Sequence, residues 1–202
     1  MRYRRAVEKL RVLAEMCQHT TRPPLDEPLL YEAYVFGEVL DGADPVERVE
    51  LALVLNLPPE DVPWESQPLG TAWLVHSLRL DKGGFAYWWR SRHRPVWNHH
   101  IRGPVRFWSL DGPDESVLHA LAERRHADLP KDVVGPTELR EQTAAELATA
   151  LARLRAAHEN YWERDRRREH RGSGRFPENH LWEAVNGYLD LLDAHHHDDP
   201  SA

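Results

Sequence analysis

The chain has 202 residues, with 26 lysines and arginines against 33 aspartates and glutamates and a formal net charge of −7. A chain this acidic does not coat nucleic acid, so any contact with an anion must be confined to one part of its surface. Cys17 is the single cysteine, which excludes an intramolecular disulfide and a cysteine-rich zinc site. The start of the chain lacks the apolar run of a signal peptide, and no segment has the length of a membrane span. We therefore expect a cytoplasmic protein.

The first third of the chain predicts one helix and two strands. Apolar side chains three and four apart over residues 3–19 indicate a helix with one buried face, which Pro23 and Pro24 end. Residues 29–40 then have the composition of a strand. Residues 49–57 are nearly all apolar, which suits a strand covered on both faces.

The middle of the chain predicts two helices and a strand pair. Residues 68–80 have the helical repeat. The side chains on their apolar face are Leu69, Trp73, His76 and Leu80. Residues 96–108 alternate between apolar and polar, as in a half-buried strand pair bent at Gly103-Pro104. Asp114 is placed to cap a helix that runs to about Arg125.

The carboxyl-terminal third predicts two more helices. The first begins at Pro136-Thr137, with Thr137 as its cap. Its apolar stripe consists of Leu147, Ala150, Leu151, Leu154, His158, Tyr161 and Trp162. The charged run over residues 164–171 is expected to be its solvated end, and a last helix covers residues 179–194. From His195 the tail is rich in histidine and predicts a frayed, solvated terminus.

In chain order, these segments predict an α/β (α+β) fold. A small mixed sheet carries packed helices, and a helical part follows it. We divide the chain into an α/β core over residues 1–130 and a helical part with a disordered tail over residues 131–202. One compact domain is the alternative.

One block of the chain contrasts with its acidic composition. Residues 82–110 contain six lysines and arginines, three histidines and half of the tryptophans, but no aspartate or glutamate. Basic side chains pair with phosphate or carboxylate groups, and flat rings stack on bases. The block therefore predicts a site for a nucleotide, a nucleic-acid end or an acidic protein surface. Its candidate binding residues are Lys82, Arg90, Arg92, Arg94, Asn98, His99, His100 and Arg102.

Other interpretations of this block stay open. The alternation over residues 96–108 is also typical of rings that belong to the core, with arginines on a solvated face. Lys82-Gly83-Gly84 is either a plain turn or a cradle whose backbone N–H groups bind a phosphate. Neither a His-Glu-x-x-His motif nor a paired-cysteine pattern occurs, so no metal site is predicted.

Residues 34–55, YVFGEVLDGADPVERVELALVL, resemble the opening of the nucleotidyltransferase fold over about a tenth of the chain. In that superfamily a Gly-Ser pair follows the first strand and holds nucleotide phosphates. An Asp-x-Asp pair on the second strand holds magnesium. The resemblance implies a mixed sheet of this type in the first half of the chain.

The chain departs from the superfamily pattern at its functional positions. Gly37 matches the glycine, but Glu38 stands at the serine and Arg48-Val49-Glu50 stands at the carboxylate pair. A carboxylate repels a triphosphate, and an arginine opposes a magnesium ion and cannot coordinate it. The resemblance therefore implies a degenerate, non-catalytic core that binds its ligand without a cofactor.

Two alternatives to a non-catalytic binding protein stay open. One is an enzyme of nucleotidyl or phosphoryl transfer with an atypical site, in which Glu50 and a histidine from residues 93–100 act as acid and base. Magnesium is expected only under that alternative. The other is an antitoxin-like or regulatory scaffold whose carboxyl-terminal helices pair with another chain.

The chain as a whole also resembles a family of uncharacterised actinobacterial proteins. The segments that carry this resemblance are GEVLDG, RLDKGGFAYWWRSRHRPVWNH, IRGPVRFWSLDGPD and EHRGSGRFPE. The resemblance covers most of the length and implies no particular activity.

Overall fold

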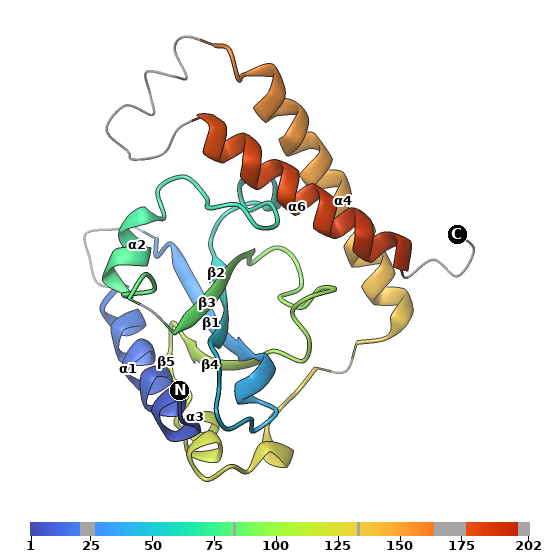
Figure 1. The fold of residues 1–202 in the computed structure, drawn as a ribbon. Helices are drawn as coiled ribbons and strands as arrows, with labels where there is room; N and C mark the ends of the chain where they lie inside the picture. The colour runs from blue at the N-terminus through green and yellow to red at the C-terminus, as the bar shows by residue number, and fades with distance from the viewer. Residues whose placement is uncertain (21–26, 83, 133, 164–176, 198–202) are drawn as a thin grey trace.

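A computed structural model describes residues 1–20, 27–82, 84–132, 134–163 and 177–197 of the chain. Its centre is a five-stranded mixed sheet in the order β3-β2-β1-β4-β5 (Figure 1). The strands are β1 (Leu30–Phe36), β2 (Val49–Leu55), β3 (Phe85–Ser91), β4 (Val105–Ser109) and β5 (Gly112–Pro113). Strand β2 is antiparallel to β1 and parallel to β3. The fold is therefore of the mixed α and β class that the sequence predicts.

Strand β2 is buried on both faces, as its apolar sequence predicts. Leu51 and Leu53 project to one face and Ala52 and Val54 to the other, and all four are buried. A strand between two neighbours hydrogen-bonds along both of its edges, so β2 has no exposed backbone edge. On this side the sheet ends at β3, because the outer edge of β3 is not paired with any described strand.

The two faces of the sheet have different covers. One face packs against α1 (Tyr3–Thr20), and the ammonium group of Lys9 lies over the ring of Phe85, which begins β3. The opposite face carries Trp88 and Arg90, and the loop over residues 92–104 covers it. Within β3, successive side chains of the basic block therefore project to alternate faces of the sheet.

Helices α1 and α3 (Glu115–Ala122) lie together at one end of the molecule (Figure 1). The hydroxyl of Tyr3 donates to the carbonyl oxygen of Leu121 at 2.9 Å and joins them. The cap of α3 is confirmed, because the Asp114 carboxylate accepts the N–H groups of Ser116 and Val117, each at 3.1 Å. The helix ends at Ala122, three residues before the predicted end.

Helices α4 (Pro136–Glu159) and α6 (Pro177–His197) cross beside each other at the other end of the molecule (Figure 1). The prediction that Thr137 caps α4 is wrong. Gly135 is the N-cap, and the Glu138 carboxylate accepts its N–H at 3.1 Å. The predicted frayed tail is also wrong at its start, because His195 and the two histidines after it continue α6. The charged run 164–171 lies outside the described residues.

The buried side of α4 differs from the predicted apolar stripe. Trp162 follows the helix and is 77 % exposed, and His158 is exposed as well. Ala150 of the predicted stripe is buried, but the helix also buries the polar residues Gln142, Thr143 and Glu146. An apolar pattern cannot locate these residues, because hydrogen bonds compensate their burial. Gln142 and Thr143 bond within α4, and Glu146 accepts from the distant Arg90 and Asn98.

Two further predicted segments are corrected. Helix α2 covers only Ala72–Ser77. On the predicted apolar face, Leu69, Trp73 and His76 are exposed, whereas Leu80 is buried. Residues 92–104 form a loop, and only β4 remains of the strand pair predicted over residues 96–108. The alternation fails at Asn98, which is fully buried although it lies on the polar side of the pattern. Among the described residues, no helix combines the length and the apolar composition needed to cross a membrane.

Candidate functional site

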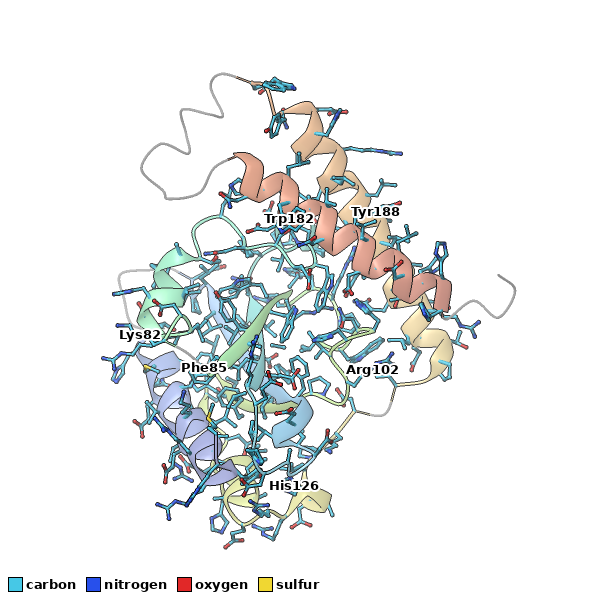
Figure 2. The ribbon with its side chains drawn as sticks, in the orientation of Figure 1. Lys82, Phe85, Arg102, His126, Trp182 and Tyr188 are labelled. Carbon is cyan, nitrogen blue, oxygen red and sulfur yellow. The ribbon has the colours of Figure 1, made fainter. Side chains whose placement is uncertain are left out.

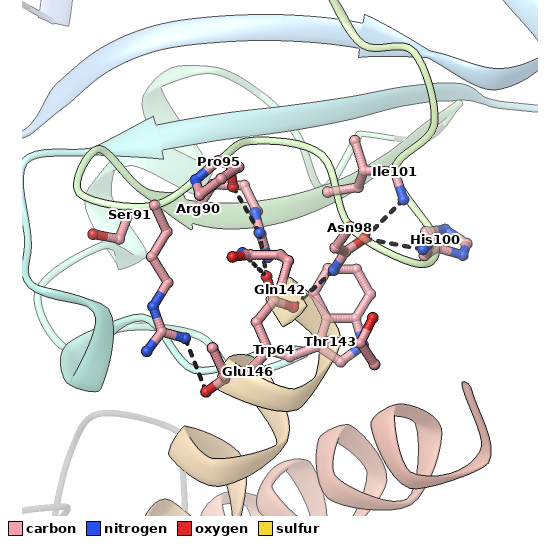
Figure 3. A network of polar contacts seen from close by, with 12 residues as sticks. Trp64, Arg90, Ser91, Pro95, Asn98, His100, Ile101, Gln142, Thr143 and Glu146 are labelled. Atoms are coloured by element: carbon pink, nitrogen blue, oxygen red, sulfur yellow. Dashed lines mark hydrogen bonds and ion pairs between the residues drawn. The ribbon is translucent and has the colours of Figure 1, made fainter. Parts of the chain in front are cut away.

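Two of the predicted binding residues, Arg90 and Asn98, lie in a buried polar network (Figure 3). The Arg90 guanidinium is 5 % exposed and donates to the Glu146 carboxylate, which comes from α4. Asn98 and Gln142 donate to the same carboxylate at 3.0 and 2.7 Å. The charge of Arg90 is thus neutralised inside the protein by a residue 56 positions away, and the network joins β3 to α4.

The Asn98 side chain also shapes the loop over residues 92–104. Its carbonyl oxygen accepts the N–H groups of His100 and Ile101 at 3.0 and 2.8 Å (Figure 3). Ile101 is thereby turned into the core, where it is fully buried. The position of Asn98 is therefore explained by its two roles, one toward the loop backbone and one toward Glu146.

Of the other arginines in the predicted set, Arg94 lines a small pocket together with Arg90, and Arg92 lies apart from both. Arg92 donates to the Asn56 side chain at 2.9 Å, and its guanidinium lies 4.2 Å from the centre of the Tyr31 ring. Arg94 reaches α4, where it donates to the Thr149 hydroxyl at 2.9 Å. Each guanidinium therefore binds a neutral partner of its own on the surface of the core.

Arg102 and the two histidines lie farther along the same loop. The Arg102 Nε group donates to the carbonyl oxygen of His99 at 2.8 Å. His99 Nε2 lies 2.7 Å from Asp190 Oδ2 on α6, and the Trp64 indole donates to the same oxygen at 2.6 Å. The hydrogen bond from His99 lowers the pKa of Asp190 below its ordinary value.

The histidines pack within a cluster of aromatic rings on the sheet face opposite α1. The rings of Trp64 and Trp88 are stacked 6.3 Å apart, and His100 lies 4.5 Å from Trp88. Phe36 contacts both Trp88 and His100. Burial lowers the pKa of His100, and the neighbouring His99 lowers it further. Both effects favour the neutral form of the His100 imidazole.

The positions of the degenerate motif are brought together only in part. Gly37 has φ of +67°, and a Cβ added there would lie 1.7 Å from Glu50 Oε2, so only glycine fits. The same oxygen accepts the N–H of Glu38 at 3.3 Å. Burial raises the pKa of the Glu50 carboxyl group. Arg48 is exposed, and the Glu38 side chain accepts the N–H of Glu47 at 2.6 Å within its own turn.

Lys82, the remaining predicted residue, lies on the α1 side of the sheet and lines a surface pocket of about 330 Å³ that we call the basic hollow. Figure 2 shows Lys82 and Phe85 on this side of the molecule and Arg102 on the other. The basic side chains of the hollow are Arg5, Lys9, Arg79 and Lys82, and its apolar side chains are Val12, Met16 and Phe85.

The cations of the basic hollow are poorly neutralised. Arg5, Arg79 and Lys82 form no ion pair with any described residue. The one carboxylate that lines the hollow, Glu8, accepts a hydrogen bond from Arg4 at 3.1 Å. A positive charge without a partner attracts anions most strongly where an apolar floor lowers the local dielectric constant. The hollow therefore has the composition of an anion site.

The basic block does not include most of this hollow. Arg5 and Lys9 come from α1 and Arg79 from the turn after α2. A sequence signal was present, because Arg5, Lys9 and Val12 are spaced four and three apart and lie on the outward side of α1. Their approach to Lys82, more than seventy residues later, depends on how α1 packs against the sheet.

Among the described residues, no three histidine, cysteine, aspartate or glutamate side chains are grouped so that they could hold a metal ion. The chain matches a family model described as a domain of unknown function, DUF7711, over residues 1–197. The match covers both the sheet and the α4–α6 pair. No curated protein and no solved structure matches the chain.

Proposed function

We propose that this chain, which belongs to the DUF7711 family, is a non-catalytic protein that binds a nucleotide phosphate in the basic hollow. The observation that carries the proposal is the gathering of Arg5, Arg79 and Lys82 around an apolar floor, without an ion pair to any described residue. A local group of cations attracts anions even in a chain of net charge −7.

The size and lining of the hollow fit a nucleotide. Its volume of about 330 Å³ is at the small end of the range for ligand pockets. Guanidinium and ammonium groups bind phosphate through charge-assisted hydrogen bonds. The ring of Phe85 is half-buried, and the Lys9 ammonium lies 5.1 Å from its centre. A base can stack on this ring once the Lys9 side chain turns toward a phosphate in the same pocket.

We place this function on a degenerate nucleotidyltransferase-like core. The contact between Gly37 and Glu50 supports that assignment, because the resemblance puts the glycine turn beside the carboxylate of the second strand. The positive charge of Arg48 near this turn disfavours a bound magnesium ion. These features support binding without phosphoryl transfer.

Reversing two charges of the hollow tests the proposal. In Arg5→Glu/Lys82→Glu, we expect the affinity for ATP and AMP to fall by at least about tenfold, because two attractive contacts become repulsive. Binding by the unchanged protein should weaken as salt rises. Isothermal titration of each nucleotide, at low and high salt, measures both effects.

The control is Arg155→Glu, which reverses one charge, half of the change in the double variant, at an exposed position of α4. Helix α4 lies at the other end of the molecule (Figure 1). Its nucleotide affinity should equal that of the unchanged protein. Equal losses in both variants, or no salt-sensitive binding by the unchanged protein, would contradict the proposal.

A second function, transfer of a nucleotidyl or phosphoryl group, is favoured by two pKa shifts. Burial raises the pKa of Glu50 and lowers that of His100, so the carboxyl group holds its proton more firmly and the imidazole holds its proton less firmly. Shifts in opposite directions suit an acid and a base. Phe36 connects the two groups, because it pairs with Glu50 across β1 and β2 and contacts the His100 ring.

For this second function, we expect magnesium-dependent turnover of a nucleoside triphosphate that Glu50→Gln reduces by about 10²-fold or more, the usual range for an acid–base group. Glu47→Gln, in the same turn but exposed, is the control. A phosphate-release assay checks both variants. If the unchanged protein turns over none of ATP, GTP, CTP and UTP, this second function is contradicted and only the binding function remains.

A further inference from the structure

A second hollow, which we call the amino-terminal groove, lies along the first turns of α1. It has a volume of about 1080 Å³ and extends from α1 to the end of α3. Its basic side chains are Arg2, Arg4, Arg5, Arg11 and Arg124. Its carboxylates are Glu8, Asp44 and Glu123. Cations therefore outnumber carboxylates along the groove.

The arginines of the groove are engaged to different degrees. Arg124 is held in place, because it donates to the Asp44 carboxylate at 2.7 Å and lies over the ring of Tyr3 at 4.3 Å. Arg2 and Arg5 form no ion pair with a described residue. Arg4 is bonded to Glu8, but both side chains are largely exposed, and such pairs contribute little. Arg2, Arg4 and Arg5 are thus available to an incoming anion.

The groove adjoins the basic hollow. Arg5 and Glu8 line both. Met1 of the groove and Lys9 of the hollow also approach the same residue, because a Cβ added at Gly84 would lie 2.6 Å from Met1 Cε and 2.7 Å from Lys9 Nζ. We call the two neighbouring pockets together the basic tract.

The spacing of the cations along α1 suits a row of phosphates. Arg5 and Lys9 are four residues apart on the same side of α1, and Arg2 lies one residue before the helix begins. At about 1.5 Å of rise per residue, the interval between Arg5 and Lys9 is about 6 Å. Neighbouring phosphates of one strand are at least about 3.4 Å apart along a nucleic-acid axis. One cation can thus accompany each phosphate.

We infer that this tract binds a single-stranded nucleic acid several nucleotides long, with its phosphates along α1 and one base against Phe85. The inference rests on the proposed function and names its ligand class. Together the two pockets are lined by eight basic and three acidic side chains, and Arg11 is also paired with Glu115, which leaves an excess of cations for several phosphates. A base stacks on a side-chain ring only when it is free of its own helix, so the strand is single.

The experiment compares nucleotides with oligonucleotides on the full chain. Fluorescein-labelled oligothymidylates of one to about twelve residues, which span the usual site sizes, are titrated at several salt concentrations. Affinity should rise at least tenfold with length and then level off. In Arg2→Glu/Arg4→Glu the affinity for a mononucleotide should stay within twofold, whereas the gain with length should be lost. The slope of log affinity against log salt should become shallower by about 1.4, since each phosphate contact contributes about 0.7.

This variant should remain folded, because carboxylates at the start of a helix interact favourably with its positive end. Circular dichroism and the melting temperature check this. If nucleotides bind but the affinity does not rise with oligonucleotide length, the inference is overturned and the proposed function stays intact. No binding of either ligand by the unchanged protein would overturn both. Equal affinity for a duplex of the same length would overturn the assignment to a single strand.

Discussion

Glu146→Leu is expected to destabilise the protein by about 3–5 kcal/mol, because it leaves the buried Arg90 guanidinium without its carboxylate. Asn98 and Gln142 lose their acceptor in the same step. A buried donor without a partner costs about 1–3 kcal/mol. Urea denaturation at pH 7, followed by circular dichroism, measures the change. A loss below about 1 kcal/mol would show that this pair is solvated.

The double variant Arg90→Met/Glu146→Leu separates the cost of an unpaired charge from the value of the pair. Replacing both members of a buried ion pair by apolar groups is often neutral or stabilising by about 1–4 kcal/mol. Here Asn98 and Gln142 would still lack an acceptor, so we expect recovery of about half of the single-variant loss. A double variant as unstable as Glu146→Leu would contradict the charge argument.

The effect of Glu146→Leu should depend on pH. Burial opposes ionisation of Glu146, but the charge of Arg90 and the hydrogen bonds from Arg90, Asn98 and Gln142 outweigh burial and lower its pKa. A carboxyl group with a lowered pKa in the folded state stabilises the fold above its unfolded pKa, and this contribution is lost as pH falls through the folded value. The difference between the two proteins should therefore be constant above about pH 5 and narrow in acid.

Gly187→Ala is expected to destabilise the protein by about 2–3 kcal/mol, although alanine is the better helix former by about 1 kcal/mol. Gly187 lies on α6 where the helix touches the Trp64 segment. A Cβ there would lie 2.3 Å from the Trp64 carbonyl oxygen, a backbone atom that cannot turn away. The helix must then move and strain the bonds from Trp64 and His99 to Asp190, which are 2.6 and 2.7 Å long.

The neighbouring substitution Asn186→Ala is the control for Gly187→Ala. It raises helix propensity on the same turn at a half-exposed side chain, so we expect no loss of stability. Thermal and urea denaturation of both variants give the comparison. A stabilised Gly187→Ala protein would mean that α6 does not pack this closely on the Trp64 segment.

The strong periodic segments predicted the fold class, α1, the first two strands and the cap of α3. These succeeded because each signal is local: an apolar stripe, a continuous apolar run, or a carboxylate one residue before a helix. The face of residues 68–80 was mistaken, because only one turn and a half of that segment is helical and Leu69 precedes it. The strand predicted before β4 does not form, because Asn98 turns inward: it donates to Glu146 of α4 and accepts the N–H of Ile101 within the loop.

The candidate site was less accessible to sequence reasoning. The basic block is continuous in the chain, but the alternation of β3 and the loop after it send its side chains to separate places. Arg90 is neutralised by Glu146, which lies in another predicted part of the chain. Lys82 instead lines a pocket with Arg5 and Lys9, which belong to the first helix of the chain.

The amino-acid sequence by itself determined the elements with a strong apolar pattern, among them α1, β1 and β2: where apolar residues repeat with the period of a helix or form a continuous run, a buried face follows from the chemistry of the segment. The tertiary structure alone decided which charges are neutralised inside the protein and which face solvent. An ion pair or an anion site needs groups within a few ångströms of each other, and those groups come from segments whose separation along the chain carries no information about their distance in the fold.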